Sequence, residues 1–181
     1  MAGMSGDRFL KSHWLWIALL ALLTLLVLGS PLFSVSEVLS QKSGDMDLQY
    51  LHSRAYGFGE LAKGHLPLWN PYVYGGVPFL GDFQSAMLYP PNLLFLIAPI
   101  AVALNWSIAL HVFILAVGMY IWATWRGLHH AAAFLAAATA ILSGSYFLHI
   151  FAGHLSNICT MAWTPFIFLG IDGWLAARNT K

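Results

Sequence analysis

The carboxyl groups of Asp45 and Asp47 are the side chains in this sequence best suited to acid–base chemistry. They begin "DMDLQYLHSRAYGFGELAK", residues 45–63, where apolar residues recur every three or four positions and predict an amphipathic helix. The exposed amides at a helix N-terminus favour negative charge, so an ionised carboxylate is expected there. Such a group can accept a proton from a hydroxyl or hold a divalent metal, which is the candidate cofactor. The alternative for Asp45 is a helix N-cap without chemistry.

The helix over 45–63 is expected to lie flat on the membrane surface. An interfacial helix of this kind buries its apolar stripe and keeps its polar face outward. Gln49, His52 and Arg54 should then face solvent or protein, and Gly64 should end the helix. The apolar stripe consists of Leu48, Leu51, Ala55, Phe58 and Ala62.

Residues 64–92 form a turn-rich segment that holds five of the eight prolines and six aromatic residues. Proline lowers the entropy lost on ordering, and Trp and Tyr favour the membrane interface. We therefore expect an ordered loop packed on the membrane. Aromatic faces beside carboxylates and Gln84 also suit sugar rings, although an interfacial belt without a ligand would explain the same residues.

The composition is that of an integral membrane protein. Of the 181 residues, 59% are hydrophobic and 8% are charged, against about 25% charged in soluble domains. The net charge is +1 and no basic patch or arm is present, so nucleic acid is not expected as a partner. The single cysteine, Cys159, excludes an internal disulfide framework and a cysteine-based zinc site.

The apolar runs predict an all-α membrane protein with about four transmembrane helices and a long outer loop. Residues 35–92 form that loop and include the interfacial helix. Residues 93–104 are too short to span and contain Pro99, which favours a re-entrant or interfacial segment. The predicted spans are 13–34, 105–126, 131–152 and 157–177.

The first span has a second interpretation as a secretory signal peptide, because Arg8 and Lys11 precede it. Its apolar run is long for a signal peptide, and "VLGS" before Pro31 is a poor cleavage site. These features favour an uncleaved anchor.

Basic residues set the expected orientation, because they concentrate on the cytoplasmic side. With residues 1–12 and 178–181 in the cytoplasm, four spans place five of the eight Lys and Arg residues inside. Five of the seven acidic residues then lie in the outer loop. If residues 93–104 spanned fully, the later basic residues would move outside, which the charge pattern disfavours. The cytoplasmic set is Arg8, Lys11, Arg126, Arg178 and Lys181.

A few polar side chains fall in the spans. His111 and His149 are expected to be hydrogen-bonded packing residues in the bundle interior. Asp172 is expected near the headgroups, as a cap or in an ion pair. Asn105 begins a glycosylation triplet that abuts a span, so modification is not expected. His154 should lie at the outer end of the third span, on the same side as Asp45.

The run "GDMDLQY…LAKGHLPLWNPYVYGGVPFLGDFQSAMLYPPNLLF" resembles the first outer loop of the YfhO-like bacterial membrane proteins. These belong to GT-C, a superfamily of polytopic glycosyltransferases that use lipid-phosphosugar donors. The likeness covers about 50 residues and continues weakly through "GSYFLHIFAGHLSNICTMAWTPFIF", where His154 and the Trp163/Pro165 pair fit. The matching elements are Gly44-Asp45, Gln49-Tyr50, "G-x-LPLWNPY", "GG-x-PFL", Gln84-Ser85 and "YPPN".

The resemblance implies a GT-C-like bundle in a bacterial inner or plasma membrane, of which this chain looks like the N-terminal portion, because family members are far longer. It also implies a sugar donor on polyprenyl phosphate, an extracytoplasmic acceptor and a catalytic acid in the outer loop. Asp45 matches that acid by its place four residues before Gln49, and Asp47 is an additional candidate. The candidate substrate-binding residues are Gln49, Arg54, Trp69, Asn70, Tyr72, Asp82, Gln84 and His154.

The resulting hypothesis is sugar transfer at the outer leaflet, with Asp45 as the base and Arg54, Lys63 or His154 beside the phosphate. One rival is a transporter or flippase component with the loop as an outer gate. Another is a non-catalytic assembly protein or an inactive fragment. Ionisable residues crowd the loop and are scarce in the spans, which favours chemistry at the surface.

Overall fold

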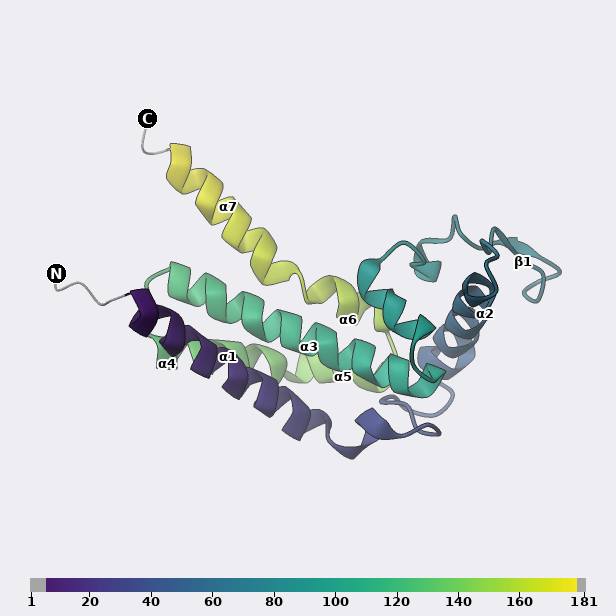
Figure 1. Cartoon of the computed structure of the whole chain (residues 1–181), viewed down its shortest axis with the longest axis horizontal. Coiled ribbons are helices and arrows are strands. Elements are labelled where there is room, and N and C mark those ends of the chain that lie inside the picture. The colour runs from purple at the N-terminus through teal and green to yellow at the C-terminus, as the bar shows by residue number, and fades with distance from the viewer. Residues whose placement is uncertain (1–5, 179–181) are drawn as a thin grey trace. The chain divides into compact units, whose positions relative to one another are not determined.

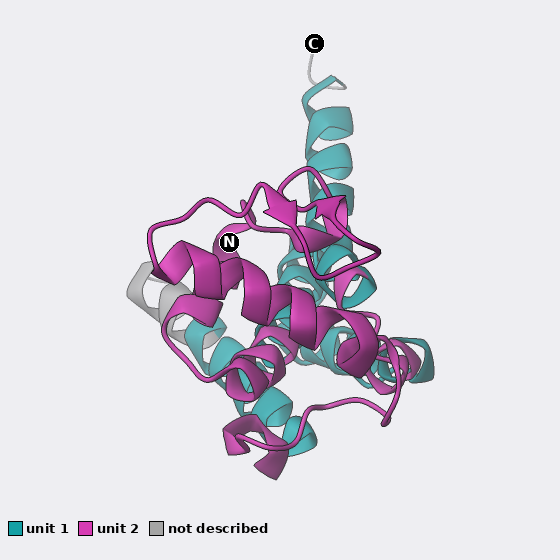
Figure 2. Cartoon of the chain, turned by 90° about the vertical axis from the view of Figure 1, so that its right-hand side faces the viewer, with its two compact units in different colours: residues 1–29, 109–147, 157–181 teal, residues 30–108, 148–156 magenta. Residues whose placement is uncertain are grey.

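The computed structural model describes residues 6–178, with side chains from His13 onward, as an all-α fold with one short strand pair (Figure 1). The chain divides into two compact units. One holds the chain up to Gly29, Ala109–Phe147 and the chain from Asn157; the other holds Ser30–Ile108 and Leu148–Ser156 (Figure 2).

Three helical segments are long and apolar enough to cross a membrane: Ile100–Trp125, His130–Ala152 and Leu155–Arg178. They indicate a multi-pass membrane protein and confirm three of the four predicted spans by length and composition. The span predicted over 13–34 is shorter. Its helix, α1 (Gly6–Leu28), has an apolar part of His13–Leu28 and is followed by a 3₁₀ turn at Ser30–Phe33.

Two of these three segments are interrupted. The second consists of α4 (His130–Ile141) and α5 (Gly144–Ala152). The third consists of α6 (Leu155–Met161) and α7 (Thr164–Arg178). Pro165 lies in the first turn of α7, where its missing N–H removes no helical hydrogen bond, so proline marks the start of this helix.

Residues 93–104 are not one segment. A 3₁₀ helix covers Pro90–Leu96, and α3 (Ile100–Trp125) begins directly after Pro99. Because proline suits the start of a helix, the residues that follow it join the long helix instead of forming a separate piece. The predicted re-entrant segment is therefore divided, and α3 starts at Ile100 instead of 105.

In the first unit, α1 packs against α4, and the Trp16 and Phe134 rings lie 5.4 Å apart (Figure 1). The side chain of Asp172 on α7 accepts a hydrogen bond from Trp122 Nε1 at 2.7 Å and lies 3.5 Å from Arg126 Nε on α3. The expectation that Asp172 is paired is thus confirmed.

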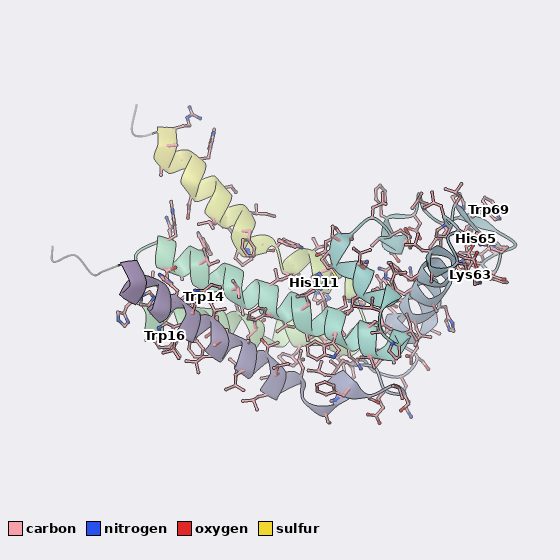
Figure 3. The ribbon with its side chains drawn as sticks, viewed as in Figure 1. Trp14, Trp16, Lys63, His65, Trp69 and His111 are labelled. Carbon is pink, nitrogen blue, oxygen red and sulfur yellow. The ribbon has the colours of Figure 1, made fainter. Side chains whose placement is uncertain are left out.

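Several polar side chains of α3 are buried. His111 is fully buried (Figure 3). Asn105 is also buried; its Nδ2 donates to the carbonyl oxygens of Pro31 at 2.6 Å and Glu37 at 2.8 Å, and its Oδ1 accepts the Leu39 N–H at 2.8 Å. This amide holds residues 31–39 against α3, which agrees with the expectation that it is not a glycosylation site.

In the second unit, the helix predicted over 45–63 consists of a π-helical turn, Met46–Tyr50, and α2 (Leu51–Ala62). Its buried side chains follow steps of four, at Met46, Tyr50, Arg54 and Phe58, and Gly57 is buried beside them. Of the predicted apolar stripe, Phe58 is buried within the protein, whereas Leu48, at 71%, Ala55 and Ala62 are exposed on the protein surface. The buried face packs on other parts of the chain.

The aromatic loop after α2 contains a short strand pair. Strand β1 (Trp69–Asn70) pairs antiparallel with β2 (Val77–Pro78), and Figure 2 shows this hairpin beside α2. Tyr56 of α2 donates its hydroxyl to the Trp69 carbonyl at 2.6 Å, and its ring meets the Phe79 ring edge-on at 5.1 Å. The loop is therefore bound to α2 through the hydroxyl and ring of Tyr56.

Candidate functional site

Asp45 stands at the start of the helix but does not cap it. Its backbone is already helical (φ −57°, ψ −29°), and its carboxylate makes no capping hydrogen bond. The N-cap interpretation of this side chain is therefore wrong. Asp47 takes the structural role instead, because its Oδ2 accepts the Ser43 N–H at 2.9 Å and closes the turn before the helix.

The turn between α5 and α6 lies directly against this helix start. Gly153 has φ +81°, and a Cβ on it would lie 2.6 Å from the Met46 backbone nitrogen. A Cβ on Gly44 would lie 2.9 Å from the Ala152 carbonyl oxygen. Both backbones approach so closely that only glycine fits at the two positions. The dipeptides Gly44-Asp45 and Gly153-His154 thus face each other.

Two hydrogen bonds hold the same contact on either side. The Gln41 N–H donates to the Phe151 carbonyl at 2.7 Å. The Tyr50 hydroxyl, one turn into the helix, donates to Ser156 Oγ at 2.9 Å. The helix start and the α5–α6 turn therefore form one fixed arrangement within the second unit.

Asp45, His154 and His149 form a chain of three side chains across this contact. His154 Nε2 lies 3.5 Å from Asp45 Oδ2, and His154 Nδ1 lies 3.0 Å from His149 Nδ1. The side chains of Asp45 and His154 are 54% and 39% exposed, so the site is open at the surface. His154 lies on the same side as Asp45, as predicted, and His149 is hydrogen-bonded, as predicted.

A second group of candidate residues lies along α2. Gln49 Nε2 donates to Gln84 Oε1, and both side chains are exposed. Asp82 caps the short 3₁₀ turn Phe83–Ser85, because its Oδ1 accepts the Gln84 N–H at 3.0 Å. The structure therefore brings Gln49 and Gln84 together and gives Asp82 a structural role.

Arg54 is buried and faces protein, one of the two environments expected for it. Its Nη1 donates to the carbonyl oxygens of Gln84, at 2.8 Å, and Ser85. Its guanidinium carbon lies 5.8 Å from the Tyr50 ring centroid and 5.9 Å from that of Phe95. Burial of this arginine is supported by the two carbonyls that accept from Nη1 and by the aromatic faces beside its charge. It fixes the backbone that carries Gln84.

Lys63 lies at the end of α2, in an ion pair. Its Nζ is 2.7 Å from Glu60 Oε1, and His65 Nδ1 is 3.1 Å from Glu60 Oε2; Figure 3 labels both basic residues at this end of the helix. The hydrogen bond from Lys63, followed by that from His65, lowers the pKa of Glu60. The same bond raises the pKa of Lys63.

The hairpin residues differ in what they offer a ligand. Asn70 is buried, and its Oδ1 accepts the Tyr72 N–H at 3.0 Å, so it shapes the turn. Trp69 is 54% exposed and Tyr72 is 82% exposed, and the Tyr72 ring meets Tyr56 edge-on at 5.8 Å. Trp69 and Tyr72 remain candidates for stacking against a substrate ring, whereas the buried Asn70 is not available to a substrate.

The described residues do not fit the metal that the carboxylates suggested. Within residues 6–178 no group of three or more His, Cys, Asp and Glu side chains is arranged to hold a metal ion. A metal site needs several such ligands around one point. The arrangement at Asp45 instead suits proton transfer.

Two features of the site were not predicted from the sequence: the partnership of His149 with His154, and the contact between the two glycine dipeptides. The five-residue spacing of the histidines around Gly153 is the only local sign of the first. No family model matches the chain, and no match is found among curated proteins or solved structures.

Proposed function

We propose that the chain forms part of a membrane glycosyltransferase of GT-C type that moves a sugar from polyprenyl phosphate to an extracytoplasmic acceptor. In this proposal the protein has four spans and a cytoplasmic N-terminus, and the outer loop carries the site. The observation that carries the proposal is the Asp45 carboxylate, which makes no capping bond, is half exposed and faces His154. The resemblance of the outer loop to the YfhO-like proteins supports the substrate class.

Asp45 acts as the general base. It removes the proton from the acceptor hydroxyl as that oxygen attacks the anomeric carbon of the donor sugar. The bond from that carbon to the lipid phosphate breaks, and polyprenyl phosphate departs with the bonding electrons. Attack opposite the leaving group in a single displacement inverts the anomeric configuration.

His154 belongs with the base and not with the phosphate. In a single displacement the attacking and leaving oxygens lie on opposite sides of the anomeric carbon. A group 3.5 Å from the base carboxylate is therefore on the wrong side for the departing phosphate. Arg54 and Lys63 are also unsuited, since one is buried against carbonyls and the other is paired with Glu60. The phosphate is held by groups other than these three.

The exposed amides and rings of the loop supply a surface for sugar or acceptor. Gln49 lies one turn after Asp45 on the same helix, and its partner Gln84 is held by Arg54 through the backbone. Primary amides donate and accept at once, which suits sugar hydroxyls. Trp69 and Tyr72 present aromatic faces for stacking.

The test is transfer from radiolabelled polyprenyl-phosphate hexoses, assayed one sugar at a time, in membranes that contain the protein. Asp45→Asn is expected to lose about 10² to 10⁴-fold, the usual contribution of a general base. Glu37→Gln is the matched control, an exposed carboxylate of the same loop, and is expected to keep full activity. Undiminished transfer by Asp45→Asn refutes the assignment.

A transporter or flippase component is the second candidate, because two candidate spans are interrupted at Leu142–Ser143 and Ala162–Trp163. Discontinuous helices often build substrate sites in transporters. Movement of a fluorescent polyprenyl-phosphate sugar across proteoliposomes without sugar transfer would favour this candidate. If neither transport nor sugar transfer is detected, a non-catalytic assembly role is favoured.

A further inference from the structure

Both ring nitrogens of His154 are engaged within the second unit. Nε2 faces Asp45 Oδ2 at 3.5 Å, and Nδ1 faces His149 Nδ1 at 3.0 Å. A neutral imidazole has one N–H donor and one acceptor nitrogen, so the two contacts fix its tautomer between them. With both nitrogens occupied, His154 offers no atom for a substrate proton.

Of the three side chains Asp45, His154 and His149, Asp45 is the one that can meet a substrate. Its carboxylate has a second oxygen, Oδ1, for which residues 6–178 provide no partner. His149 sits at the other end, on α5, where it is half-buried. The order is therefore carboxylate, imidazole, imidazole, running from the surface inward.

We propose that His149 is a positioning residue for the reaction: it fixes the ring and tautomer of His154 so that the Nε2–H of His154 holds the Asp45 carboxylate in place for the acceptor hydroxyl. This inference rests on the proposed glycosyl transfer and deepens it. It assigns to His149 a role that its place in an apolar helix did not suggest.

The proton balance is simple. In the resting state the His149 Nδ1–H donates to His154 Nδ1, and the His154 Nε2–H is directed at Asp45 Oδ2, because a carboxylate only accepts hydrogen bonds. Asp45 takes the hydroxyl proton of the acceptor on Oδ1 as the bond from the anomeric carbon to the lipid phosphate breaks. Both histidines stay neutral, and the Nε2–H keeps Oδ2 in place during the transfer. After polyprenyl phosphate has left, the proton passes from Asp45 Oδ1 to water.

The contact between the helix start and the α5–α6 turn holds Asp45, His154 and His149 in this arrangement. The turn that carries His154 is held by the Gly153 approach to Met46 and by the bond from Gln41 to Phe151. His149 lies just before that turn, so both imidazoles move with one backbone segment. Rings held in this way keep the Asp45 carboxylate aligned without reorganisation during the reaction.

Two variants separate positioning from simple packing. His149→Asn keeps a polar atom near the place of Nδ1, whereas His149→Leu removes it in a side chain of similar size. Each is compared with the wild type in the full chain. The exposed His52 supplies the control variant His52→Asn.

The first readout needs no substrate: ¹⁵N NMR of the histidine rings in detergent micelles, with the His154 signals assigned through their loss in His154→Gln. We expect His149→Leu to change the tautomer signature of His154, and His149→Asn and His52→Asn to preserve it. An unchanged His154 signature in His149→Leu overturns the inference by itself.

The second readout is transfer from the radiolabelled polyprenyl-phosphate hexoses. His149→Leu is expected to lower kcat by about tenfold, the upper worth of one hydrogen bond between neutral groups, with KM unchanged. His149→Asn is expected to restore most of that loss. A higher KM with unchanged kcat contradicts the positioning role. If the wild type transfers no sugar, the proposed function fails and the catalytic role of His149 fails with it, whatever the NMR signature.

Discussion

Gly153→Ala is the substitution that tests the site's architecture most sharply. The new methyl group would lie 2.6 Å from the Met46 backbone nitrogen and 2.9 Å from the Met46 Cβ, at a residue with φ +81°. An L-residue in that left-handed conformation costs about 1–2 kcal/mol. The clash adds about 1–3 kcal/mol, because neither backbone can move without disturbing its own hydrogen bonds.

The chain provides a matched control in Gly64→Ala. Gly64 has the same φ of +81°, but a Cβ there meets nothing within 4 Å. The control is therefore expected to cost only the conformational term, about 1–2 kcal/mol. The difference between the two variants isolates the close approach of the α5–α6 turn to the helix start.

The assay is reversible unfolding in mixed SDS micelles followed by tryptophan fluorescence. Gly153→Ala is expected to be less stable than Gly64→Ala by about 1–3 kcal/mol. It should also lower sugar transfer by about 10²-fold, because His154 moves away from Asp45. Equal stability of the two variants would refute the close contact and, with it, the geometry of the Asp45–His154–His149 chain.

Three further outcomes follow from the described contacts. Asn105→Leu is expected to destabilise the protein by about 3 kcal/mol in the same unfolding assay, because it removes three hydrogen bonds to partly buried backbone groups. Arg54→Met should speed limited proteolysis within residues 64–92, since the loop loses the two hydrogen bonds that Arg54 donates to it. Lys63→Gln should raise the pKa of Glu60 in a ¹³C carboxyl titration. Because that pKa lies below its usual value, the stabilising pair is present above pH 4.5 and is lost as the pH falls through the lowered value.

The apolar segments were predictable because length and composition decide whether a helix can cross a membrane. Residues 105–126, 131–152 and 157–177 all lie in or almost wholly within long apolar helices of the structure. The helix after Asp45 was also predictable, and it ends at Ala62, close to the expected stop at Gly64.

The face that this helix buries was not predictable from periodicity. The face buried within the protein carries Tyr50 and Arg54 beside Met46 and Phe58, so apolar periodicity alone does not identify it. The burial of Arg54 depends on carbonyls 30 and 31 residues further along the chain, at Gln84 and Ser85. The residues around Arg54 do not indicate which distant carbonyl groups it will bind.

The arrangement of Asp45, His154 and His149 could not be predicted from the sequence for the same reason. His154 could be placed on the side of Asp45 from the order of the spans. Its contact with Asp45 depends on Gly153 meeting Met46, residues more than a hundred positions apart. Gly44 and Gly153 each precede a candidate residue in the sequence, but only the fold shows that the two dipeptides are in contact.

A double-mutant cycle on sugar transfer tests the central claim most directly: that Asp45 and His154 work as one proton-accepting unit. Asp45→Asn, His154→Gln and the double variant are compared with the wild type for kcat. If the two groups act together, His154→Gln costs activity in the wild type and almost nothing once Asp45 has been replaced. Losses that multiply independently in the double variant would contradict the claim.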